Sequence, residues 1–116
     1  MKIEGEAKRL RVYIGESDHW KGQSLATAIV EMCRREGLAG ATVSRGVMGF
    51  GASSRIHTTH ILDLSTDLPL IIDIIDKPER IEKIKPILDE MVTEGLITQE
   101  DVHIIKYTHN QLKASQ

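Results

Sequence analysis

The length of 116 residues, a hydrophobic fraction of 41% and a formal net charge of −2 are typical of one globular domain, which we expect to span residues 1–116. This charge gives no support for a nucleic-acid partner, because domains that bind nucleic acids usually carry a clear excess of basic residues. A single cysteine excludes an intrachain disulfide, and no apolar run reaches membrane-spanning length, so we expect a cytoplasmic protein without membrane insertion.

The first half of the chain predicts a strand, a helix and a second strand. Apolar and polar residues alternate over residues 8–15, which favours a strand, whereas residues 1–6 are polar and we expect them to fray. The spacing of apolar residues predicts a helix over residues 23–36. Residues 41–48 predict the second strand, which leads into a glycine-rich turn.

The second half begins with residues 51–68, which show no sustained periodicity and predict a long loop. Residues 69–76 then predict a strand that is apolar on both faces. We expect Asp76 to cap a helix whose buried stripe runs from Ile81 to Met91. A last strand is predicted over residues 101–107, followed by a polar tail.

This order of elements predicts the α+β, ferredoxin-like fold, with two helices on one face of a four-stranded antiparallel sheet. If Leu70, Ile72 and Ile74 face the helices, Ile71 and Ile75 point to the open face. A small chain that exposes an apolar sheet face is expected to self-associate, so we predict a homo-oligomer.

In its order of elements and its motifs, the chain resembles the PII signalling family, and most closely the small bacterial PII-like proteins of unassigned function. The resemblance covers the element order from Lys8 to Tyr107, the Gly40-Ala41-Thr42-Val43 stretch, the Gly49-Phe50-Gly51 turn and the long loop after it. It implies a homotrimer with an adenine nucleotide in each cleft between subunits. It also implies a regulatory role, with the loop over about 51–68 signalling to a partner protein.

The same resemblance implies where the nucleotide binds. The turn would line the cleft, Thr42 would lie near its base, and three cations are candidates for phosphate contacts, so the expected nucleotide-binding residues are Thr42, Arg45, Gly49, Phe50, Gly51, Arg55 and Lys106. PII proteins also grip phosphate with a Gly-Asp-Gly-Lys turn before the last strand, whereas residues 95–101 here contain two acids and no lysine. We therefore expect ADP or AMP rather than ATP as the ligand, and no obligatory cofactor.

Other readings remain open. His57 and His60 are either exposed loop residues or metal ligands of a structural or metal-linked trimer similar to the CutA proteins, which share the fold. Trp20 either covers the edge of the core or stacks on a ligand, and Asp73 either lies at a subunit interface or faces solvent. No set of nucleophile, base and orienting group supports catalysis, so we expect no enzyme, with slow nucleotide hydrolysis as the alternative.

Overall fold

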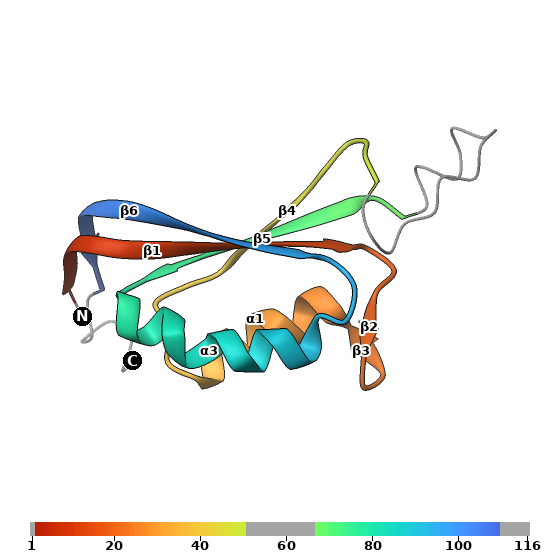
Figure 1. The fold of residues 1–116 in the computed structure, drawn as a ribbon, viewed down its shortest axis with the longest axis horizontal. Coiled ribbons are helices and arrows are strands. Elements are labelled where there is room, and N and C mark those ends of the chain that lie inside the picture. Colours follow the sequence, from red (N-terminus) through yellow and green to blue (C-terminus); the bar gives the residue numbers. More distant parts are fainter. Residues whose placement is uncertain (1, 51–66, 110–116) are drawn as a thin grey trace.

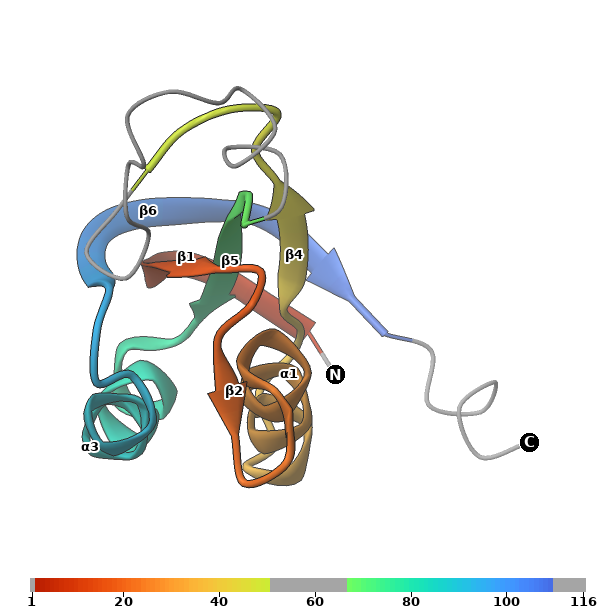
Figure 2. The same ribbon diagram turned by 90° about the vertical axis from the view of Figure 1, so that its right-hand side faces the viewer.

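The computed structural model describes residues 2–50 and 67–109, which form a sheet layer and a helix layer (Figure 1). The elements in chain order are β1 (Lys2–Gly15), β2 (His19–Trp20), β3 (Gln23–Ser24), α1 (Leu25–Arg35), β4 (Thr42–Arg45), β5 (Pro69–Asp76), α3 (Pro78–Met91) and β6 (Leu96–Thr108). The main sheet has the strand order β4-β5-β1-β6, and every neighbouring pair is antiparallel. Both helices lie side by side on one face of it (Figures 1 and 2), which confirms the α+β, ferredoxin-like fold.

The paired region of β1 and β6 is longer than the sequence predicts. Residues 2–6 do not fray but pair with β6, from Lys2 opposite Thr108 onward, and β6 begins at Leu96. The register of this pair shifts between Ile3 and Gly5, as in a β-bulge, which locally increases strand twist. The sequence does not predict this extension, because its charged side chains interrupt the apolar alternation that indicates a strand. A pair of strands that extends beyond the helices needs few apolar residues.

The core lies between the helices and one face of the sheet. It is built from aliphatic side chains of both central strands and both helices, including Leu10, Ile72, Ile29 and Ile84. Cys33 of α1 is also part of it, and burial raises the pKa of its thiol to about 11. None of the helices among the described residues is long and apolar enough to cross a membrane.

Asp76 does not cap α3 as predicted. The N-cap residue is Lys77, and the Asp76 side chain instead accepts hydrogen bonds from the backbone N–H groups of Lys77 at 2.7 Å and Ala39 at 2.8 Å. The prediction is wrong because Asp76 is still the last residue of β5, one position too early to reach the first turn of the helix. Its carboxylate therefore ties the end of β5 to the segment that precedes β4.

Candidate functional site

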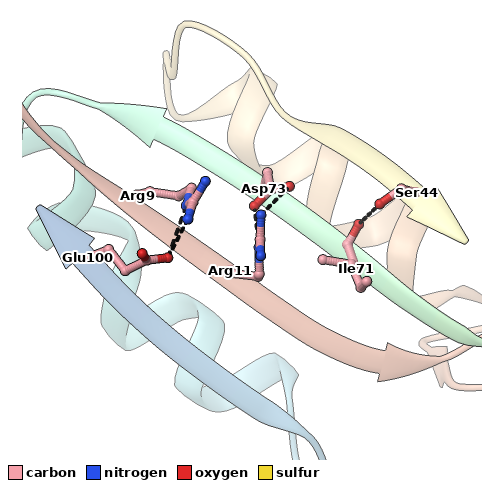
Figure 3. Close-up of polar contacts among 6 residues, drawn as sticks. All are labelled: Arg9, Arg11, Ser44, Ile71, Asp73 and Glu100. Carbon is pink, nitrogen blue, oxygen red and sulfur yellow. Dashed lines mark hydrogen bonds and ion pairs between the residues drawn. The ribbon is translucent and has the colours of Figure 1, made fainter. Parts of the chain in front are cut away.

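The sheet face opposite the helices carries two ion pairs between neighbouring strands (Figure 3). Arg11 of β1 donates to Asp73 of β5, with Nε 2.8 Å from Oδ1 and Nη2 3.4 Å from Oδ2. Arg9 donates to Glu100 of β6, with Nε 3.1 Å from Oε1. Hydrogen bonding to the Asp73 carboxylate raises the pKa of Arg11 above its ordinary value. The Asp73 charge is therefore balanced within this subunit, on the open face rather than in the core.

Apolar side chains lie beside these pairs on the same face. The register places Ile71 opposite Tyr13, and Tyr13 opposite Leu96, so the three residues form one row across β5, β1 and β6. Ile75 lies opposite Arg9 and is 39% exposed, and Leu96 is 55% exposed. The register thus confirms that Ile71 and Ile75 point away from the helices.

A pocket of about 400 Å³ opens where the start of β4 meets β5 and the end of β6. Its lining residues come from four separate segments of the chain: Ile3, Ala39, Gly40, Ala41, Thr42, Asp73, Ile75, Ile104, Lys106 and Tyr107. Most of these side chains are apolar, and a few convergent polar groups lie among them. This size and this composition are typical of sites for small organic ligands.

The charges of the lining favour an anion. Asp73 is neutralised by Arg11, whereas no hydrogen bond or ion pair joins the Lys106 ammonium group to another residue within 2–50 and 67–109. The pocket therefore combines one available cation with the Thr42 hydroxyl group and an apolar surface. Such a set can hold a phosphate or carboxylate group next to a flat apolar ring.

Of the residues expected to bind nucleotide, Thr42 and Lys106 are brought together in this pocket, although 64 positions separate their numbers, 42 and 106. Arg45 is not among the lining residues. It lies at the end of β4 and forms an ion pair with Glu16, with Nε 3.0 Å from Oε2. The phosphate-contact role expected of Arg45 thus stays a prediction, and its guanidinium group already has a partner.

The described part of the glycine-rich turn, residues 46–50, follows β4 and does not line the pocket within one subunit. Gly49 has a φ of +153°, and a Cβ atom there would lie 3.3 Å from Cγ of Pro69, so the position suits glycine. Phe50 is 66% exposed. The two other expected residues, Gly51 and Arg55, lie outside the described residues, and their role stays a prediction.

The other eight lining residues were not among those expected to bind nucleotide: Ile3, Ala39, Gly40, Ala41, Asp73, Ile75, Ile104 and Tyr107. Ile3 is 2% exposed, yet it lies in the polar terminus for which fraying was expected. The alternation of Val102 and Ile104 in the last strand was visible, but it does not reveal that the end of β6 faces the start of β4.

The structure tests one of the alternative interpretations, that of Trp20. Trp20 packs against the edge of the core, and the Lys21 ammonium group lies 5.2 Å from the centre of its ring, which favours the core reading. His57 and His60 lie outside the described residues. In the part of the chain that the structure describes, no three His, Cys, Asp or Glu side chains lie close enough together to hold a metal ion.

The pattern of residues matches a known family over most of the chain. Residues 7–104 match DUF190, described as "Uncharacterized ACR, COG1993", and the chain belongs to this family. A UPF0166 protein of Methanocaldococcus jannaschii is 36% identical over 102 residues, which covers 87% of this chain and 94% of that protein. A UPF0166 protein of Aquifex aeolicus is 36% identical over 100 residues, with coverages of 84% and 92%.

Solved structures share the fold. CPII from Thiomonas intermedia, bound to ADP, AMP and acetate, matches with a TM-score of 0.52 and 16% identity, over 90% of this chain and 91% of that chain. A second CPII structure, bound to ADP and bicarbonate, also has a TM-score of 0.52, with 21% identity over 85% and 88% of the two chains. The likeness confirms a PII-like fold.

Proposed function

We propose that this DUF190 protein is a PII-like regulatory protein that binds an adenine nucleotide in the pocket on the open face of the sheet. The observation that carries the proposal is the meeting of Thr42 and Lys106 on an apolar pocket of about 400 Å³. The fold supports it, because solved structures of the PII-like protein CPII are bound to ADP and AMP.

In this proposal the adenine ring packs against Ile75 and Ile104, and the phosphate end of the ligand reaches the Lys106 ammonium group. The Thr42 hydroxyl group donates a further hydrogen bond. Lys106 is the one cation among the described lining residues, so the pocket balances few phosphate charges. ADP or AMP is therefore the preferred ligand over ATP.

The open face also supports an assembly. The row formed by Ile71, Tyr13 and Leu96 is apolar and exposed in part, which favours burial against other copies of the chain. We propose a cytoplasmic homotrimer in which a neighbouring subunit closes each pocket.

The loop over about 51–68 follows β4 and carries the signal to a partner protein, without catalysis. A nucleotide reorders such a loop only if it binds one loop state more tightly than the other.

Calorimetric titration with ADP, AMP and ATP tests the proposal. We expect saturable binding of ADP and AMP, weaker binding of ATP, and a loss of about tenfold in ADP affinity for Lys106→Gln, since a charge-assisted hydrogen bond contributes about 1.5 kcal/mol. Lys85→Gln is the matched control, because Lys85 lies on α3 in the helix layer and lines no part of this pocket. The absence of both binding heat and a thermal shift with all three nucleotides would overturn the proposal.

A further inference from the structure

The wall of the pocket starts at Ala39, and hydrogen bonds hold this residue from both sides. Its N–H donates to Oδ2 of Asp76 at 2.8 Å, and its carbonyl oxygen accepts from the Tyr107 hydroxyl group at 3.2 Å. The two partners belong to the end of β5 and to β6, which are distant in sequence from the segment between α1 and β4. Ala39 is therefore the point at which three parts of the chain are fixed relative to one another.

Asp76 is unusual for its place. It is 0% exposed and is the one buried polar or charged residue in the described part of the chain. Its other oxygen accepts from the Lys77 N–H at 2.7 Å, and the nearest cation, Nη1 of Arg80, lies 3.7 Å from Oδ2. Burying a carboxylate is costly unless hydrogen bonds satisfy it. A carboxylate at this position therefore indicates a role that an aliphatic side chain could not perform.

Arg80 extends the same arrangement. Its Nη1 also donates to the carbonyl oxygen of Gly37 at 3.3 Å, so the Asp76 and Arg80 side chains together hold the chain at two points before β4. The segment they hold continues directly into Gly40 and Thr42, which line the pocket. A displacement of Ala39 would move this wall relative to Lys106 on β6.

We infer that Asp76 is a positioning residue for the ligand pocket, acting through the Ala39 peptide, with Tyr107 as the second anchor of the same residue. The effect on nucleotide binding rests on the proposed function, whereas the anchoring of Ala39 does not. Asp76 touches no ligand in this inference. From its buried position it fixes the location of the pocket wall, so the shape of the pocket depends on the end of β5.

Amide hydrogen exchange measured by NMR tests the anchoring without any ligand. Asp76→Leu keeps a side chain of similar size but removes both acceptor oxygens, so the N–H groups of Ala39 and Lys77 both lose their partner. We expect the Ala39 amide to exchange about tenfold faster, relative to the core amide of Ile72, than in the wild type. Tyr107→Phe removes only the hydroxyl group and is expected to raise the same ratio by about threefold.

The control is Ile84→Val, a buried change on α3 that lowers global stability without touching Ala39. It should speed exchange at Ile72 and Ala39 alike. If Ala39 follows Ile72 in every variant, Asp76 has no local role and the inference is overturned. If Asp76→Leu does not fold, Tyr107→Phe still tests whether Ala39 is held locally, and an unchanged ratio of the two exchange rates overturns the inference.

A double-mutant cycle on ADP affinity tests the consequence for binding. We expect each single variant to weaken ADP binding by about three- to tenfold, and the double variant to be no weaker than the more affected single one, because both act through one peptide. Losses that multiply would show that Tyr107 acts only by touching the ligand, which contradicts the inference. If the wild type binds no ADP, the proposed function fails, while exchange at Ala39 still decides the anchoring.

Discussion

The Arg11 guanidinium group binds the Asp73 carboxylate through two hydrogen bonds across β1 and β5, at 2.8 and 3.4 Å. Asp73 lines the pocket and Arg11 does not. A residue outside the pocket thus neutralises the acid inside it, and leaves Lys106 to set the sign of the local charge.

Opposite effects on nucleotide affinity are therefore expected from the two halves of this pair. Arg11→Gln leaves the Asp73 charge uncompensated and should weaken ADP binding by about three- to tenfold, whereas Asp73→Asn should strengthen it by a similar factor at low salt. Calorimetric titration measures both. Arg9→Gln is the matched control, because its partner Glu100 does not line the pocket and the affinity should stay unchanged. Changes of the same sign in both variants would contradict this electrostatic account.

The assembly predicts a difference between the two faces of the sheet. Ile75→Glu places a charge on the open face and should convert the oligomer to monomers, because burying an unpaired carboxylate is unfavourable. Val43→Glu is the control: Val43 is 40% exposed, close to the 39% of Ile75, but the register places it opposite Ile72 on the helix side. Size-exclusion chromatography with light scattering gives the masses. A wild-type monomer at micromolar concentration would remove the basis for the assembly.

The buried Cys33 thiol predicts a loss of stability at high pH. Burial raises its pKa from 9.0 to about 11, so the folded protein holds this proton more tightly than the unfolded chain. The stabilising contribution is fully present below pH 9 and is lost as the pH rises toward 11, with a total of about 2 to 3 kcal/mol. Denaturant unfolding across this range should show a steeper decline for the wild type than for Cys33→Ala. Parallel declines would show that the thiol ionises freely in the fold.

Gly95, just before β6, is a position where adding one methyl group should strongly lower stability. Its φ is +155°, and a Cβ atom would lie 2.6 Å from the carbonyl oxygen of Tyr13. Gly95→Ala should lower the free energy of unfolding by about 3 kcal/mol, because the backbone must shift and the conformation is strained. Gly40→Ala meets nothing within 4 Å and should change stability by less than about 0.5 kcal/mol. Thermal and urea unfolding compare the two, and similar losses would contradict the stated contacts.

Periodicity was sufficient to predict the fold, because the buried stripes of α1 and α3 and the doubly apolar strand β5 determine which faces pack. It failed at the ends of the strands. Residues 2–6 read as a polar terminus, since Lys2, Glu4 and Glu6 need no burial in a ribbon that extends beyond the helices. β4 was predicted to reach residue 48 but ends at Arg45, where the N–H of Gly46 donates to Pro69 and the chain leaves the sheet.

The candidate site was predictable only in part. A likeness in sequence pointed to Thr42 and to the cations, but local patterns carry no information on which distant segments meet. β4 and β6 are the two outer strands of the sheet, yet residues from the start of β4 and the end of β6 line one pocket, so that Lys106 joins Thr42 while Arg45 pairs with Glu16. Asp76 was expected to cap α3, whereas it ends β5 and binds Ala39, 37 positions away, a contact that no local pattern reveals.

A crystal structure of the protein grown with ADP would show whether the nucleotide binds in this pocket. We expect electron density for the nucleotide in the pocket of about 400 Å³, with adenine against Ile75 and Ile104 and a phosphate oxygen within hydrogen-bond distance of Nζ of Lys106. Density for ADP at another surface, or an empty pocket at saturating ADP, would contradict it.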